Sequence, residues 1–128
     1  MAAVPGDSIR VSVRTDREAY TPGERIVMDL RVDVTGRDSV VLEFPTSQRY
    51  DLAIVDAGGK EVWRWSRGRA FLQAFGLEVI RPEGVRWSES WVTDAPAGRY
   101  RVIARLTLAS GSASDTVFIE VRDRVSGP

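Results

Sequence analysis

Apolar and polar residues alternate with a period of two through much of this chain. Residues 25–34 place Ile26, Met28 and Leu30 on one face and Asp29 and Arg31 on the other. Successive side chains of a strand point to opposite faces of a sheet, so this pattern predicts strands with one face in a core. The same alternation recurs at residues 8–14, 40–44, 98–108 and 115–121.

Turn-forming residues separate these runs. Glycine, proline and small polar residues cluster at 21–24, 35–38, 57–60, 82–84, 94–98 and 110–112. Short strands with frequent turns predict an all-β fold, here an immunoglobulin-like antiparallel β-sandwich of about seven to nine strands. Tyr100 follows the turn Pro96-Ala97-Gly98, where such sandwiches often place a corner tyrosine that bonds a nearby backbone group. The length fits a single domain over 1–128, with an ordered core from about residue 7 to about residue 123.

Two more alternating runs predict a hairpin. Residues 50–55 and 61–66 flank Gly58-Gly59, and Trp63 and Trp65 share one face of the second run. Two interpretations stay open: the tryptophans anchor the sandwich, or together with the nearby arginines they form an exposed binding patch. Asp56 precedes the two glycines and is placed to cap the turn through its side chain.

The segment that follows the hairpin, 67–75, does not alternate. Phe71 and Phe75 are four residues apart and Gly76 comes next, so one or two helical turns closed by glycine would account for it. An irregular loop would account for it as well.

The composition argues against an enzyme. The chain contains no histidine and no cysteine. This removes the commonest general base, the Ser-His and Cys-His pairs, disulfides and the usual zinc ligands. Lys60, the only lysine, sits at a turn, whereas a catalytic lysine needs burial to lower its pKa. Neither a metal nor a cofactor is indicated, since the carboxylates follow no known ligand spacing and Asp51 and Asp56 point to opposite faces.

Charge and hydropathy limit the partners. With 18 basic and 18 acidic residues the formal net charge is zero, which argues against nucleic-acid binding. No run of 18 apolar residues occurs, so no membrane span is expected. Residues 1–6 lack the regions of a signal peptide, which favours the cytoplasm over secretion, although a trimmed leader would leave the same sequence. Nothing in the sequence indicates the oligomeric state.

The hairpin region resembles the bacterial intracellular proteinase inhibitor (BsuPI-type) domain. The resemblance covers roughly residues 20–108 and is most specific from Asp51 to Gln73. Thr46-Ser47-Gln48 and Pro82-Glu83-Gly84 depart from the family's Ser-Gly-Gln and Pro-Gly-Glu, both at turns. The resemblance implies an immunoglobulin-like β fold and, for the founding member, inhibition of an intracellular subtilisin-type serine protease. The matching positions that we interpret as structural are Gln48, Tyr50, Asp51, Asp56, Trp63, Trp65, Ser66, Trp91 and Tyr100.

Together these observations predict a protein that acts by binding another protein, without catalysis. The first hypothesis is an inhibitor of a subtilisin-type serine protease that presents the loop 66–82, because such enzymes hold extended segments by backbone hydrogen bonds. The alternative is a noncatalytic β-sandwich interaction module with an unknown partner. Phe71 and Phe75 could instead seal the open end of the sandwich. The candidate binding residues are Arg67, Arg69, Phe71, Leu72, Gln73, Phe75 and Leu77.

Overall fold

A computed structural model describes residues 8–123 of the chain. All ten elements in this part are strands. They are β1 (Ile9–Thr15), β2 (Ala19–Tyr20), β3 (Arg25–Val34), β4 (Val40–Phe44), β5 (Tyr50–Asp56), β6 (Glu61–Arg64), β7 (Gly76–Ile80), β8 (Val85–Val92), β9 (Gly98–Leu106) and β10 (Ser114–Val121).

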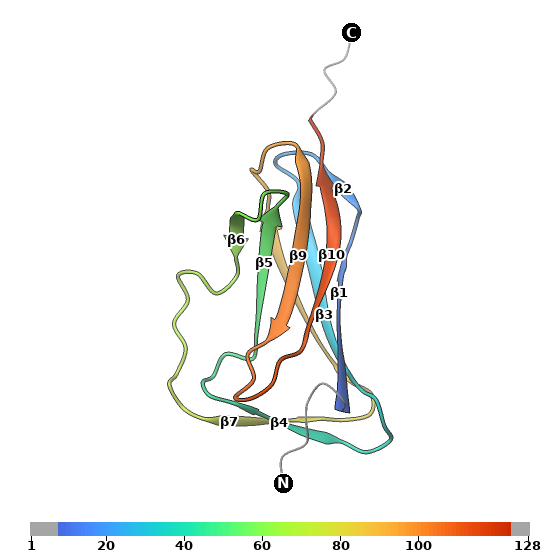
Figure 1. Ribbon diagram of the computed structural model, residues 1–128, viewed down its shortest axis with the longest axis vertical. Coiled ribbons are helices and arrows are strands. Elements are labelled where there is room, and N and C mark those ends of the chain that lie inside the picture. Colours follow the sequence, from blue (N-terminus) through green and yellow to red (C-terminus); the bar gives the residue numbers. More distant parts are fainter. Residues whose placement is uncertain (1–7, 124–128) are drawn as a thin grey trace.

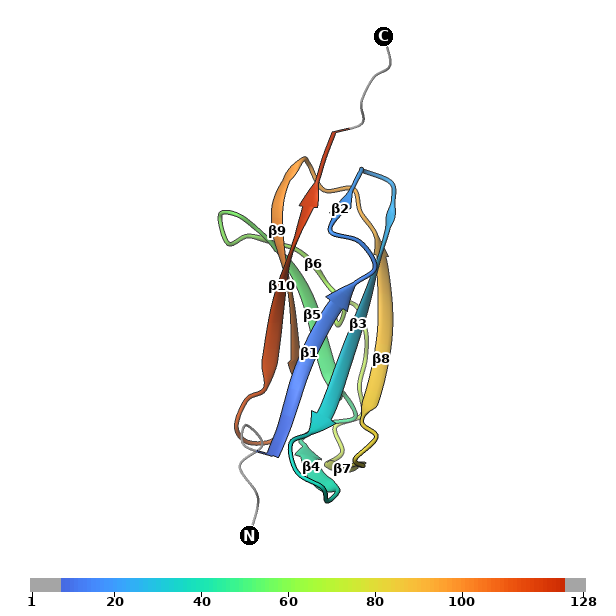
Figure 2. The same ribbon diagram turned by 90° about the vertical axis from the view of Figure 1, so that its right-hand side faces the viewer.

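Two sheets form the layers of a sandwich (Figures 1 and 2). One sheet has the strand order β1-β3-β8, and the other has the order β2-β10-β9-β5-β6. The pairings are antiparallel except for β2, which runs parallel to the end of β10. On one side the layers are joined where the backbone N–H of Val13 in β1 donates to the carboxylate of Asp115 in β10, at 2.9 Å.

A separate two-stranded ribbon, β4–β7, lies across one end of the sandwich (Figure 1). Its strands are antiparallel, with Val40 opposite Ile80 and Phe44 opposite Gly76. Leu42, Phe44 and Ile80 are buried in the core. The ribbon therefore closes this end of the sandwich with one face and leaves the other face outside.

The core is built from the inward faces that the alternation predicts. Ile26, Met28 and Leu30 of β3 are fully buried, as are Val102 and Ala104 of β9 in the opposite sheet. Burying each of the larger side chains, from valine upward, contributes roughly 1.5–3 kcal/mol, which makes the period-two faces the main source of stability.

Two turns are held by the side chains expected there. The hydroxyl of Tyr100 donates to the backbone carbonyl of Pro96, at 2.6 Å, which is the hydrogen bond that the corner position predicts. One carboxylate oxygen of Asp56 accepts from the backbone N–H groups of Gly58 (3.0 Å) and Lys60 (2.8 Å). These hydrogen bonds give partners to polar backbone groups in the two turns.

The antiparallel immunoglobulin-like sandwich is confirmed, with ten strands where about seven to nine were expected. The additional strands are β2, β7 and β8. In β8 the alternation was hidden, because Glu89 occupies an inward position between Trp87 and Trp91. The single domain over 1–128 stays a prediction; residues 1–7 and 124–128 lie outside the described part.

Of the two interpretations of segment 67–75, the irregular loop is confirmed and the helical turns are wrong. The backbone makes turn hydrogen bonds from Arg67 to Arg64 and from Arg69 to Ser66, and Gly68 has a positive φ of 81°. The backbone groups of Leu72 then bond to Ser47 and not to residues one turn earlier in the segment. Tertiary hydrogen bonds thus replace helical ones, and the segment is an irregular loop.

Candidate protein-binding surface

The segment 65–75, hereafter loop 65–75, is tied at its start to a buried carboxylate. Asp51 of β5 is 3% exposed and accepts hydrogen bonds from the Ser66 hydroxyl (2.6 Å), the Ser66 N–H (3.1 Å) and Arg64 Nη1 (2.8 Å). Burial acts to raise the pKa of Asp51, but the hydrogen bonds from Ser66 and Arg64 outweigh it and hold this pKa below its ordinary value. Asp51 therefore ties the first residues of the loop to a central strand.

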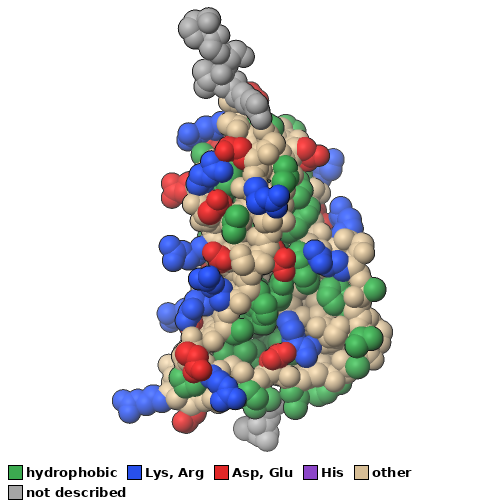
Figure 3. Space-filling view, turned by 180° about the vertical axis from the view of Figure 1, so that it is seen from behind, with side chains coloured by type: hydrophobic (Ala, Val, Ile, Leu, Met, Phe, Trp, Pro, Cys, Tyr) green, Lys and Arg blue, Asp and Glu red, His purple; other side chains and the backbone are tan. Residues whose placement is uncertain are grey.

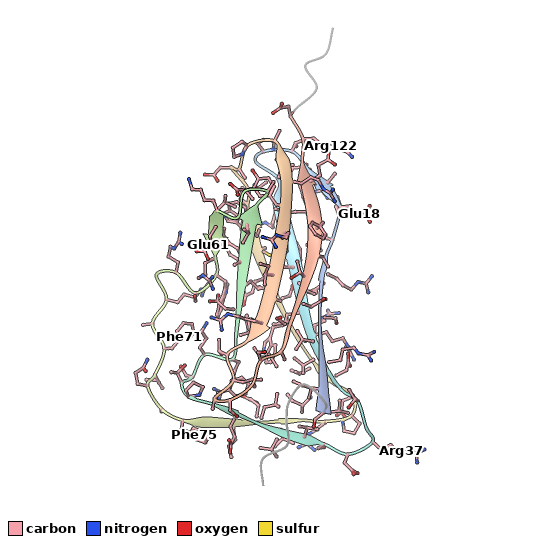
Figure 4. All side chains as sticks on the ribbon, in the orientation of Figure 1. Glu18, Arg37, Glu61, Phe71, Phe75 and Arg122 are labelled. Atoms are coloured by element: carbon pink, nitrogen blue, oxygen red, sulfur yellow. The ribbon has the colours of Figure 1, made fainter. Side chains whose placement is uncertain are left out.

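The Trp65 ring packs against side chains of the next part of the loop. Its ring stacks on Tyr50 with centroids 4.6 Å apart, and the Arg69 guanidinium lies 4.4 Å from its centroid. Arg69 Nε also donates to the Trp65 carbonyl, at 2.8 Å. Phe71 packs against the same ring at 5.8 Å and lies beside the hairpin in Figure 4. These contacts order residues 65–71 on the edge of the sandwich.

The middle of loop 65–75 is held by a reciprocal pair of hydrogen bonds. Ser47 N–H donates to the Leu72 carbonyl (2.9 Å), and Leu72 N–H donates to the Ser47 hydroxyl (2.8 Å). At Gly76 the chain enters β7 opposite Phe44. Gln73-Ala74-Phe75 is thus an exposed tripeptide fixed at both ends, and the side chains of Leu72 and Phe75 are 73% and 62% exposed.

Arg49 supports the far end of the loop. Its guanidinium donates to Glu78 (2.8 Å) and to the Thr46 carbonyl (2.8 Å), and it lies 4.8 Å from the Phe44 ring centroid. A Cβ at residue 76 would come within 2.6 Å of this guanidinium, so the close approach depends on Gly76. Arg49 therefore fixes where the loop joins β7.

The outer face of the β4–β7 ribbon is largely apolar, with Glu43 also on it, opposite Leu77. Val41, Leu77 and Val79 are 55%, 55% and 52% exposed, and Val41 lies opposite Val79. Phe75 has the same strand parity as Leu77 and Val79. In the view from behind, hydrophobic side chains reach the surface at this end of the molecule (Figure 3). We call Val41, Phe75, Leu77 and Val79 the apolar patch.

The apolar patch and Leu72 make up five of the seven exposed large hydrophobic residues in the described part of the chain. Soluble proteins rarely gather such side chains without a use, and exposed apolar clusters mark interaction sites. The surface is therefore suited to contact another protein.

The family-signature residues make internal contacts. Gln48 donates to the Tyr50 carbonyl, at 3.0 Å, and the Tyr50 hydroxyl bonds to the Glu89 carboxylate. Burial, followed by the bond to Glu89, raises the pKa of Tyr50. Trp63 stacks on Trp91 across the two sheets with centroids 5.8 Å apart. Both hairpin tryptophans are half-buried and packed against the core, which favours the anchor over the exposed patch.

The structure divides the candidate binding residues into separate groups. Leu72, Gln73 and Phe75 are exposed in the loop, whereas Phe71 is half-buried. Phe75 does not seal the open end of the sandwich. Leu77 belongs to β7, so the expected loop 66–82 is interrupted by a strand.

The two candidate arginines sit at the start of the loop, away from the apolar patch. Arg69 covers Trp65, and Arg67 forms an ion pair with Glu61. Both are exposed, and both are already committed to contacts within the hairpin region.

Sequence reasoning missed Val41, Val79 and Ser47. The alternation at 40–44 identified a strand, but it did not indicate that the opposite face would be left without a covering layer. Ser47 carried no signal of its own, because its partner lies 25 residues away.

In residues 8–123, no group of three or more acidic side chains could hold a metal ion. No helix in the same range is long and apolar enough to cross a membrane.

Comparison with solved structures shows the fold. The sporulation control protein Spo0M from Bacillus subtilis is 17% identical over 89% of this chain and 49% of its own, with a TM-score of 0.59. The alkylpurine DNA glycosylase AlkC from Pseudomonas fluorescens, solved bound to DNA containing an abasic site analog, is 16% identical over 90% of this chain and 30% of its own, with a TM-score of 0.50. The chain thus spans about half or less of these proteins.

The sequence comparisons identify the family. The search of curated proteins found no match. The family model BsuPI, described as intracellular proteinase inhibitor, matches residues 13–111, which include β2 to β9 and the last three residues of β1. The chain therefore belongs to the BsuPI family of intracellular proteinase inhibitors.

Proposed function

We propose that this protein binds a subtilisin-type serine protease through loop 65–75 and slows it without catalysing a reaction itself. Membership of an inhibitor family supports a protease as the partner. The observation that carries the choice of loop is the exposed tripeptide Gln73-Ala74-Phe75, held between the Leu72–Ser47 hydrogen bonds and the start of β7.

The arrangement suits a protease in two ways. Backbone groups of residues 73–75 have no hydrogen-bond partner within residues 8–123, so they are available to a substrate-binding cleft, which holds its ligand as an added strand. The fixed ends reduce the ordering cost that a flexible segment would carry on binding. Leu72 and Phe75 are the large apolar side chains available for a specificity pocket.

The test is a titration of a purified subtilisin-type protease with this protein and with the variant Phe75→Ala. We expect the wild-type protein to slow cleavage of a chromogenic peptide and Phe75→Ala to raise the inhibition constant by roughly tenfold or more, as for a binding hot spot. Phe118→Ala is the matched control, because Phe118 is a 58% exposed phenylalanine on β10. It should inhibit like the wild type.

Two results would contradict the proposal. Unslowed cleavage at micromolar concentrations of this protein would exclude that protease as the target. Equal inhibition by Phe75→Ala and Phe118→Ala would remove the loop from the binding site.

A second candidate function is a noncatalytic interaction module, favoured by the apolar face of the β4–β7 ribbon. Val41 and Val79 lie on a strand surface and not in the loop. If the partner binds this face, Val41→Asp should abolish its capture from a native lysate while Phe75→Ala has a smaller effect. A larger loss of capture with Phe75→Ala than with Val41→Asp would favour the loop.

A further inference from the structure

The backbone of β8 has one side without a partner. Thr93 N–H donates to the Glu24 carbonyl just beyond the β3–β8 pairing. Hydrogen-bonded and non-hydrogen-bonded pairs alternate in an antiparallel ladder. Trp87, Glu89 and Trp91 therefore bond to β3, while the N–H and C=O groups of Arg86, Ser88, Ser90 and Val92 point away from it. Figure 2 shows β8 as the outermost strand of its layer.

The other edge strands of the two layers are partly covered or short. The outward N–H of Val13 in β1 is taken by Asp115. The end of β10 is paired with β2, and β6, at the far edge of its sheet, has four residues. By contrast β8 has eight residues in unbroken register with β3 and contains no proline or bulge, and its inward charge, Glu89, is bonded to the Tyr50 hydroxyl.

We propose that the free edge of β8 pairs antiparallel with β8 of a second copy of this chain. A second copy fits because the chain carries no net charge to repel itself and because the outward side chains of Ser88 and Ser90 are short and exposed. The two three-stranded layers then become one continuous six-stranded sheet across the pair. The proposal does not depend on protease inhibition.

Charge selects the register of this pairing. A two-fold axis at Glu89 would set this carboxylate opposite Glu89 of the partner subunit, and like charges directly opposite are destabilising. An axis at Ser88 sets Arg86 opposite Ser90 of the partner subunit and Trp87 opposite Glu89 of the partner subunit. It keeps seven residues, 85–91, in register and places no like charges directly opposite.

The absence of cysteine makes this register directly testable. In the proposed pairing Ser88 faces its own copy across a hydrogen-bonded pair, with Cα atoms about 5.5 Å apart, within disulfide range. Ser90 is offset from its copy by four residues, about 13 Å, which is beyond that range. On mild oxidation we expect Ser88→Cys to form a covalent dimer at least tenfold faster than Ser90→Cys, a control of matched exposure.

A second pair of variants tests the backbone. Proline is tolerated on an edge where its missing N–H faces outward, so Ser88→Pro should keep the β3 ladder but block pairing. Sedimentation equilibrium at high protein concentration should give twice the 14.2 kDa mass for the wild type and for Ser88→Ala, and the monomer mass for Ser88→Pro. A monomeric wild type, or equal crosslinking of the two cysteine variants, would overturn the proposal.

Discussion

At the scale of single residues, Asp51 joins both strands of the hairpin to the start of loop 65–75. Its carboxylate accepts hydrogen bonds from Leu52 N–H, Ser66 and Arg64, and Arg64 also bonds to Glu61. A buried carboxylate costs free energy unless its oxygens are satisfied, and here both are. The position therefore tolerates neither loss of charge nor loss of its partners.

We expect Asp51→Asn to lower the free energy of unfolding by about 2–3 kcal/mol, since hydrogen bonds to a buried charge are worth about that much together. Urea unfolding followed by tryptophan fluorescence measures this change. Asp56→Asn is the control: an amide oxygen can still accept the turn hydrogen bonds, so its loss should stay within about 0.5 kcal/mol. Equal losses in the two variants would contradict the role assigned to Asp51.

The pKa of Asp51 gives a prediction about acid stability. Because the folded protein lowers this pKa below 3.8, its stabilising contribution is present above about pH 4 and is lost as the pH falls through the lowered folded value. The difference in unfolding free energy between the wild type and Asp51→Asn should therefore be constant from pH 7 to about pH 5 and shrink below about pH 4. A difference that grows on acidification would have the wrong sign.

At the scale of elements, loop 65–75 is ordered by contacts with a distant segment. Ser47 holds Leu72 through two hydrogen bonds, and Arg49 supports the entry into β7. Ser47 and Arg49 lie in the connection from β4 to β5, just before the first strand of the hairpin. The β4–β5 connection thus holds the tripeptide 73–75 in place as much as the loop itself does.

We expect Ser47→Ala to loosen the loop and leave the sandwich intact. It removes the bond to Leu72 N–H and keeps the one from Ser47 N–H, so the local cost is about 1 kcal/mol, or roughly a fivefold rise in the population of open loop. Amide exchange of the Ser47 N–H, which still donates to the Leu72 carbonyl, should speed up by about that factor with an unchanged global unfolding midpoint. Ser112→Ala, at an exposed serine between β9 and β10, should leave the exchange unaltered.

At the scale of the whole molecule, the sheets join strands that are distant in the sequence. Ile54 of β5 lies opposite Val102 of β9, and Val27 of β3 lies opposite Ser90 of β8. Long loops must close before such contacts form, so folding of sandwiches with these connections is slow.

We therefore expect refolding from urea in milliseconds to seconds, as measured by stopped-flow tryptophan fluorescence. Trp63, Trp65, Trp87 and Trp91 are half-buried between the sheets, so one signal should report docking of both layers. Complete refolding in microseconds would contradict this dependence on non-local pairing.

Different parts of the structure could be predicted to different degrees. The strands at 25–34 and 40–44 were predicted with their observed bounds, because one clean apolar face is a local property. For segment 67–75 the sequence left helical turns and an irregular loop both open, since Phe71 and Phe75 have a helical spacing while the distant Ser47 decides the conformation. Glu89 concealed β8 because its partner, the Tyr50 hydroxyl, lies in the other sheet.

The amino-acid sequence by itself determined the all-β class, the core faces, the hairpin with its capped turn, the corner tyrosine and the family. All of these depend on residue type and on spacing over a few positions. Only the tertiary structure decided that the β4–β7 ribbon leaves an apolar face exposed, that Ser47 fixes Leu72, and that β8 ends its sheet with unpaired backbone groups. The physical reason is that strand pairing and burial depend on residues far apart in the chain, which a period of two does not specify.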